Sequence, residues 1–119
     1  MRTNCYMSFE IKTIENFDRQ AHRLAKHYPS FREDFKTLLK ELKKNPLAGV
    51  DLGGGIRKVR MAIASKGKGK SGGARVITYT ADIILKEKEG QLILLSVYDK
   101  SEQSTISDNE IKRLKKLLF

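Results

Sequence analysis

The apolar residues change their spacing along the chain, from a helical period in the first third to strand-like alternation later. A stripe at i, i+4, i+7, i+8 and i+11 is formed by Phe17, Ala21, Leu24, Ala25 and Tyr28. This spacing places the five side chains on one face of a helix that begins near residue 16 and ends at Pro29. The chain is therefore predicted to hold its helices and strands in separate runs.

A second stripe repeats the same spacing at Phe31, Phe35, Leu38, Leu39 and Leu42. Ser30 and Glu33 form a Ser-x-x-Glu capping box, which predicts the start of this second helix, and Asn45 followed by Pro46 predicts its end. Because so short a turn joins them, the two helices are expected to pack as an antiparallel hairpin.

Four other runs have the alternation or composition of strands. They are residues 5–11, 56–63, 74–85 and 91–98, and a polar turn at residues 87–90 is expected between the last two. The last three runs follow a break of three glycines at residues 53–55.

A second capping box, at Ser107 and Glu110, precedes a terminal helix with Ile111, Leu114 and Leu118 on its apolar side. The order of elements predicts one domain over residues 1–119 with an α+β fold. That fold would have a small, mostly antiparallel sheet of about four strands, an N-terminal helical hairpin and a C-terminal helix.

The charge balance narrows the classes of partner. The 119 residues include 24 Lys and Arg against 14 Asp and Glu, a formal net charge of +10, which favours nucleic acid, an anionic membrane surface or an acidic protein. No apolar run approaches the roughly 18 residues of a membrane span, so no membrane is expected. The single Cys5 cannot form an internal disulfide, and a cytoplasmic protein is predicted.

Basic residues concentrate in residues 52–81, which contain seven Lys and Arg and no acidic residue. Alternation along the strand at 56–63 places Lys58 and Arg60 on one face and apolar residues on the other. On the next strand Arg75 and Tyr79 share a face. Whether that face is also the face of Lys58 and Arg60 depends on strand register, which the sequence leaves open.

The glycine-rich stretch between these strands, residues 67–71, resembles the end of a nucleotide-binding P-loop. Ala64 stands where that motif needs glycine, and two glycines and a strand follow where it needs a helix, so ATP and GTP are excluded. We expect a mobile loop that attracts RNA through Lys66, Lys68 and Lys70, together with Arg57 on the preceding strand.

Other catalytic chemistries find little support in the sequence. His22 and His27 fall off the apolar stripe of the first helix and are expected at the surface. No His, Cys or carboxylate residues show metal-ligand spacing, and no Ser/His/Asp or Cys/His set can be assembled. We therefore predict neither a metal nor a cofactor.

Three stretches carry a resemblance to a known family: IRKVR at 56–60, KSGGARVITY at 70–79 and LLSVYDKSE at 94–102. With them the chain resembles the RelE/ParE superfamily of bacterial toxins, and most of all the HigB-like RelE branch of type II toxin–antitoxin systems. The resemblance implies an antiparallel sheet flanked by helices and cleavage of messenger RNA in the ribosomal A site. It also implies a cognate antitoxin, of helix-turn-helix type, that neutralises the toxin.

The resemblance assigns catalytic roles to Lys58, Arg60, Arg75 and Lys100. The tyrosine that RelE uses for proton transfer has no counterpart here, because the nearest position is Ile106. Tyr98 could substitute for it.

The proposed chemistry begins when a 2′-hydroxyl of RNA attacks the adjacent phosphate. The enzyme must remove that proton, protonate the leaving 5′-oxygen and stabilise the added negative charge, for which Lys and Arg are suited. Two alternatives stay open: a ParE-like gyrase poison, and a non-catalytic RNA-binding module. The basic pair beside Arg75 argues against the gyrase poison, whereas only an assay separates the enzyme from the RNA-binding module.

Overall fold

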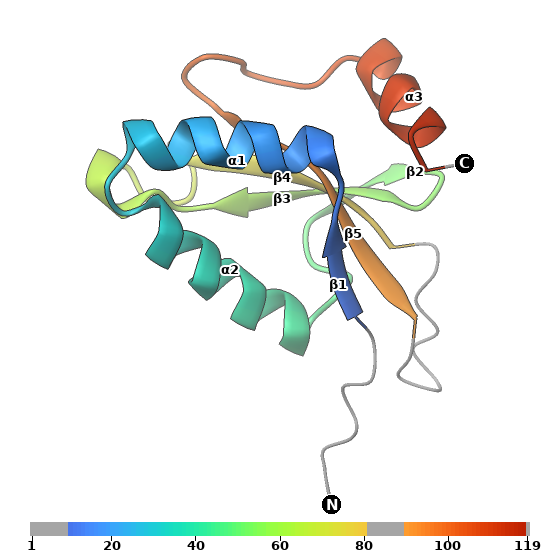
Figure 1. The fold of residues 1–119 in the computed structure, drawn as a ribbon, viewed down its shortest axis with the longest axis horizontal. Helices are drawn as coiled ribbons and strands as arrows, with labels where there is room; N and C mark the ends of the chain where they lie inside the picture. The colour runs from blue at the N-terminus through green and yellow to red at the C-terminus, as the bar shows by residue number, and fades with distance from the viewer. Residues whose placement is uncertain (1–9, 81–89, 119) are drawn as a thin grey trace, which may run out of the picture.

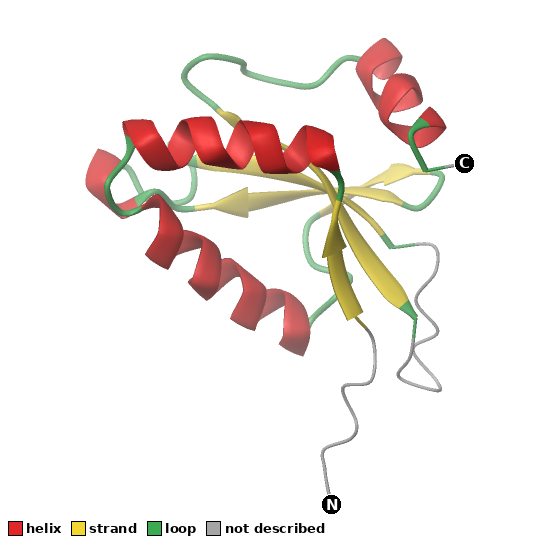
Figure 2. Ribbon diagram, in the orientation of Figure 1, coloured by secondary structure: helices red, strands yellow, loops and turns green. Residues whose placement is uncertain are grey.

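The computed structural model describes residues 10–80 and 90–118, which form one sheet with helices on both of its faces (Figures 1 and 2). The strands are β1 (Glu10–Thr13), β2 (Val50–Gly53), β3 (Ile56–Met61), β4 (Ala74–Tyr79) and β5 (Gln91–Asp99). The helices are α1 (Glu15–His27), α2 (Phe31–Lys44) and α3 (Asp108–Lys116), with a short 3-10 turn, η1 (Ala64–Lys66).

The strands are arranged in the order β1-β5-β4-β3-β2. The pairs β2–β3, β3–β4 and β4–β5 are antiparallel, whereas β1 lies parallel to β5 at one edge. The predicted α+β class is confirmed, and the described sheet has one strand more than expected. That strand, β2, is short and largely exposed, so its residues lack the alternation that reveals a half-buried strand.

Some predicted boundaries differ from the observed ones. The strand expected over residues 5–11 is described only from Glu10 onward, so its first part, with Cys5, lies outside the described residues. Of the strand expected over 74–85, β4 covers Ala74–Tyr79, whereas residues 81–85 and most of the turn expected at 87–90 lie outside the described residues. The strand expected over 56–63 ends at Met61, because the chain there turns toward η1.

Both predicted helical stripes cover one face of the sheet. Phe17 and Leu24 of α1 and the apolar residues of α2 pack with Val59, Met61 and Val76 in a single cluster. The helices diverge from the corner that joins them (Figure 1), and α1 packs more extensively on β5 than on α2. The expected hairpin is therefore an open one, held to the sheet by burial of both stripes.

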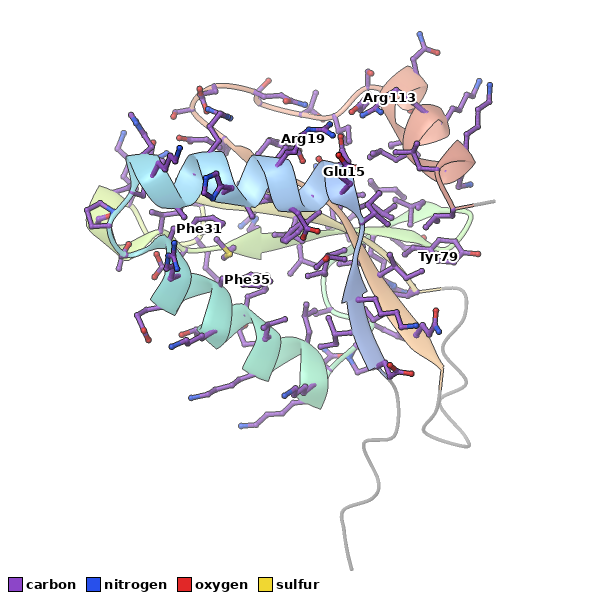
Figure 3. All side chains as sticks on the ribbon, in the orientation of Figure 1. Glu15, Arg19, Phe31, Phe35, Tyr79 and Arg113 are labelled. Carbon is purple, nitrogen blue, oxygen red and sulfur yellow. The ribbon has the colours of Figure 1, made fainter. Side chains whose placement is uncertain are left out.

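Aromatic rings fill the space where the two helices approach each other. The ring centroid of Phe35 lies 5.5 Å from that of Phe17 and 6.4 Å from that of Phe31. Figure 3 labels the two α2 rings, which project from the same side of that helix. The contact between Phe17 and Phe35 links the first turn of α1 to α2.

The two predicted capping boxes have different outcomes. Ser107 caps α3, because its Oγ accepts a hydrogen bond from the backbone N–H of Glu110 at 3.1 Å. Ser30 is the N-cap residue of α2, so the predicted start of that helix is confirmed, but its side chain makes no capping hydrogen bond, so the predicted capping box is wrong. Its hydroxyl instead donates to Asp34 and accepts from the backbone N–H of Ser65. Ser30 therefore joins the start of α2 to η1.

The opposite face of the sheet is covered only in part, by α3. Leu114 and Ile106 pack there with Ile56, Ile77 and Leu95. Arg113 of α3 also reaches the start of α1, where its Nη2 donates to Asn16 Oδ1 at 3.2 Å (Figure 3). Among the described residues, no helix is both long and apolar enough to cross a membrane.

Candidate functional site

Three predicted site residues lie directly across from one another on adjacent strands. Arg60 of β3 pairs with Arg75 of β4, which in turn pairs with Tyr98 of β5. Residues that pair across antiparallel strands project from the same face of a sheet. The register thus joins the two faces that the sequence left unrelated, and we call Arg60, Arg75 and Tyr98 the cross-strand row.

Lys58 lies beside this row, on the same face, opposite Ile77. Val59 and Met61 point to the other face, into the cluster under α1 and α2. Lys100 follows β5 directly, and its backbone N–H donates to the carbonyl of Gly73 at 3.1 Å. Lys100 is therefore held at the Arg75 end of the sheet, as the expected pairing of the last two strands implied.

The members of the row differ in their access to solvent. Arg60 and Lys100 are exposed and Lys58 is half-buried, whereas Arg75 and Tyr98 are each only 4% exposed. An anion can thus reach Lys58, Arg60 and Lys100. Arg75 and Tyr98 are buried beneath them.

Arg75 is not the free cation that the sequence suggested. Its guanidinium donates to the backbone carbonyls of Lys70 at 3.0 Å, Ser71 at 3.0 Å and Ala74 at 3.1 Å. Burial and, secondarily, the charge of Arg60 lower the pKa of Arg75 from its ordinary value. The carbonyl oxygens that Arg75 binds stabilise its positive charge beside that of Arg60.

The hydroxyl of Tyr98 has no hydrogen-bond partner among the described residues, although it is buried. Burial raises the pKa of Tyr98, and the nearby charge of Arg75 opposes that rise. Ile106, the position where RelE would have its tyrosine, is buried in the same apolar cluster as Tyr98. Tyr98 is therefore a phenol beside Arg75 whose hydroxyl stays protonated at neutral pH because its pKa is raised.

The loop that joins β3 to β4, residues 62–73, is held in place at both of its halves, which corrects the expectation of a mobile loop. The backbone N–H groups of Ala64 and Ser65 donate to Asp34 Oδ2 at 3.0 Å and to Ser30 Oγ at 2.9 Å. Its second half is bonded to Arg75 as described above. We refer to residues 62–73 as the glycine-rich loop.

Lys66, predicted to attract RNA, is instead buried in an ion pair. Its Nζ lies 2.6 Å from Asp99 Oδ1, and the side chains are 7% and 1% exposed respectively. Asp99 also accepts hydrogen bonds from the hydroxyls of Tyr28 and Ser101. These four residues form the Asp99 cluster, which joins the glycine-rich loop to β5 and to the end of α1. The ammonium of Lys66 is thus already paired with a carboxylate, and its role in binding RNA stays a prediction.

Three further residues predicted to bind RNA, Arg57, Lys68 and Lys70, differ in their surroundings. Arg57 lies on the face of the helical hairpin, where its Nη1 donates to the carbonyl of Leu47 at 2.9 Å, so it does not join Lys58 and Arg60. Alternation sends Arg57 to the side of β3 opposite Lys58 and Arg60, and its role in binding RNA stays a prediction. Lys68 is exposed, and Lys70 is about half-exposed with an ion pair to Glu41 at 2.9 Å.

His22 and His27 are both exposed, as predicted. Within residues 10–80 and 90–118, no three His, Cys, Asp or Glu side chains come together in a way that could hold a metal ion.

Comparison with known families now adds to this geometry. The family model of the RelE toxin of the RelE / RelB toxin–antitoxin system matches residues 16–118. This chain belongs to the RelE toxin family. The matched range contains the helical hairpin, the cross-strand row and α3, so the family covers every element of the site described above.

Membership in the RelE toxin family makes this protein the toxin of a toxin–antitoxin system and implies a cognate antitoxin as its partner. The match is to the RelE family as a whole, so the HigB-like branch stays a prediction.

The Asp99 cluster of this RelE toxin was missed from the sequence. One signal was present: Asp99 directly ends a run of apolar residues on β5, and a carboxylate in such a position needs partners. Those partners, Tyr28 and Lys66, come from segments far apart in the chain, so spacing alone does not reveal them.

Gly73 connects the glycine-rich loop of the toxin to β4, and its position leaves no room for a side chain. A Cβ atom there would lie 2.1 Å from the carbonyl oxygen of Met61. We expect Gly73→Ala to lower the free energy of unfolding by about 2–3 kcal/mol, because backbone must move to make room. Urea unfolding followed by circular dichroism measures this loss.

Gly69→Ala is the control for that substitution. Gly69 has a φ of 62° but nothing within 4 Å of an added Cβ, so its replacement should cost only about 1 kcal/mol. Equal losses of stability in the two variants would show that the close approach of Gly73 to β3 does not make its substitution more costly.

Proposed function

We propose that this RelE family toxin is an endoribonuclease that cuts messenger RNA on the ribosome and thereby inhibits translation. The observation that carries the proposal is the cross-strand row, with Lys58 beside it, on the sheet face that α3 leaves partly uncovered. Three accessible cations around a buried phenol suit a phosphate that gains negative charge during cleavage.

The roles follow from exposure and charge. Lys58, Arg60 and Lys100 would bind the scissile phosphate and stabilise its added charge, because their side chains are the accessible ones. Tyr98 would donate a proton or a hydrogen bond to the leaving 5′-oxygen once RNA binding uncovers its hydroxyl, which has no partner among the described residues and stays protonated because its pKa is raised. Arg75 lies between them, in contact with the glycine-rich loop.

The cross-strand row lacks the usual residues for proton transfer, and positioning of the RNA by the ribosome would compensate for this. No histidine or carboxylate belongs to the cross-strand row, so the usual pair for proton transfer in ribonucleases is not provided by these residues. Holding the RNA in a reactive conformation can contribute several orders of magnitude in rate. We infer that the ribosome provides this positioning, in the cytoplasm, where translation takes place.

The antitoxin would be of the helix-turn-helix type and would cover the face that carries Lys58 and Arg60. The net charge of +10 attracts an acidic partner over long distances at low salt. An antitoxin bound there would occupy the phosphate site and keep the toxin from messenger RNA.

Induced expression without the antitoxin tests the activity. We expect growth to stop, and primer extension on cellular messenger RNA to show cuts within translated regions. Purified toxin should cut messenger RNA on programmed ribosomes faster than the same RNA alone. Growth arrest with DNA breaks and intact transcripts would instead indicate a gyrase poison. RNA that is bound but remains uncut would indicate a non-catalytic RNA-binding module.

A further inference from the structure

A guanidinium that binds substrate needs free donors and access to solvent. Arg75 has five N–H donors in a planar group. Its Nη1 donates to the carbonyls of Lys70 and Ala74, and its Nη2 donates to the carbonyl of Ser71, at 3.0–3.1 Å. The guanidinium thus makes three hydrogen bonds to backbone carbonyls, two of them in the glycine-rich loop.

Arg60 offers a comparison on the same face. It lies directly opposite Arg75 and is exposed, whereas Arg75 is 4% exposed. No hydrogen bond joins the Arg60 guanidinium to any described residue, so Arg60 keeps the donors that Arg75 has already used. Two arginines in one cross-strand pair therefore have different surroundings and suit different tasks.

The first half of the glycine-rich loop is held without Arg75. Lys66 is paired with Asp99, and the preceding turn is bonded to Ser30 and Asp34. The second half contains Ser71 and three glycines, and Arg75 contributes a charged group that binds its carbonyls. The Lys70–Glu41 ion pair and the bond from Lys100 N–H to the Gly73 carbonyl also hold this half. Because glycines allow many backbone conformations, the buried bonds from Arg75 add a restraint that the exposed ion pair does not replace.

We propose that Arg75 is a positioning residue, which holds the second half of the glycine-rich loop beside the cross-strand row and does not itself bind the scissile phosphate. The inference rests on the proposed ribonuclease activity for its catalytic consequence, but the holding of the loop is independent of that activity. Loss of the planar group would free the loop and alter the surroundings of Tyr98, the partner of Arg75 across β5. Arg75 would thus contribute to cleavage indirectly, by holding the loop and the surroundings of Tyr98 in place.

Arg75→Lys and Arg60→Lys make a matched pair of variants. Each keeps the positive charge and removes the planar set of donors, and the two positions face each other in the sheet. In Arg75→Lys, hydrogen exchange at residues 68–73 should become roughly tenfold faster, because bonds from a charged donor are lost. In Arg60→Lys, exchange of the loop should stay at the wild-type rate while cleavage of messenger RNA falls.

Cleavage measurements complete the comparison. The positioning role predicts that kcat of Arg75→Lys falls together with the protection of the loop. Unchanged loop exchange in a folded Arg75→Lys variant, with cleavage reduced as in Arg60→Lys, would overturn the proposal and assign Arg75 to the phosphate. If the wild-type toxin cuts no RNA, the proposed function fails, and loop exchange still decides whether Arg75 holds the loop.

A measurement on the wild-type chain covers the case in which Arg75→Lys does not fold. In the NMR spectrum, the Nη–H signals of Arg75 should exchange slowly, because three carbonyls hold them. On addition of a single-stranded oligonucleotide with a 2′-deoxy residue at the cleavage position, these signals should persist, while those of Arg60 shift. Loss or a large shift of the Arg75 signals on addition of this probe would contradict the proposal.

Discussion

Asp99→Asn is expected to lower the free energy of unfolding of this toxin by about 3–5 kcal/mol. The substitution leaves the ammonium of Lys66, whose side chain is 7% exposed, without the carboxylate that neutralises it. It also weakens the bonds that join Tyr28 and Ser101 to the end of β5. Urea unfolding followed by circular dichroism at pH 7 measures the loss.

Glu102→Gln is the matched control for Asp99→Asn, because it removes a carboxylate three residues further along the chain. Glu102 pairs with Arg23 at 3.2 Å, but both side chains are more than half exposed. Exposed pairs contribute less than about 1 kcal/mol. A similar small loss in both variants would show that the Lys66–Asp99 pair is not an important part of the fold.

The stability of the wild-type chain should also depend on pH through Asp99. Burial would raise the pKa of Asp99, but hydrogen bonds from Lys66, Tyr28 and Ser101 outweigh burial and hold it well below its usual range. Such a carboxylate stabilises the fold above its unfolded-state pKa of about 3.9. That contribution is lost as the pH falls toward the folded-state pKa. Below pH 4 the wild-type chain should therefore lose stability more steeply than Asp99→Asn.

Lys58→Ala and Arg60→Ala are each expected to reduce the rate of messenger RNA cleavage by about 100-fold or more. Both side chains lie on the face opposite the hairpin core and are accessible, so their loss removes charge from the site and leaves the core intact. Toxicity after induction and single-turnover cleavage on programmed ribosomes are the measurements. Unfolding curves should stay close to wild type.

Two controls separate a specific site from general attraction to RNA. Lys40→Ala removes the same charge from an exposed position on α2, and Lys68→Ala removes it from the glycine-rich loop. Both should affect cleavage much less, since such lysines contribute mainly to non-specific binding of phosphate. Equal losses in all four variants would mean that net charge, and not the cross-strand row, determines activity.

Most of the fold follows from local patterns. The stripes that begin at Phe17 and Phe31 bury enough apolar surface to define α1 and α2, and the alternation around Val59 defines β3. β2 was not predicted because its exposed residues have no burial pattern to read. The parallel placement of β1 next to β5 was also not predicted, because it pairs the first described strand with the last. Nothing in the sequence near β1 specifies that partner.

The candidate site was predicted only in part, because the surroundings of a basic side chain cannot be read from the sequence. Alternation correctly placed Lys58 and Arg60 on one face, but composition alone assigned Arg57 and Lys66 to RNA. The sequence does not show whether a basic side chain contacts water, a carbonyl or a buried carboxylate. Arg75 illustrates this, since it reads as a free cation and is bonded to three carbonyls.

By itself, the sequence determined the features that depend on composition or on residues close together in the chain. These are the helices and most strands, the excess of positive charge, and the faces of single strands, since side-chain direction repeats every two residues in a strand and every 3.6 in a helix. Tertiary structure alone decided the register that aligns Arg60, Arg75 and Tyr98, and the burial that pairs Lys66 with Asp99. Those contacts join residues that are distant in the chain, and they form only when the whole sheet and its helices exclude water together.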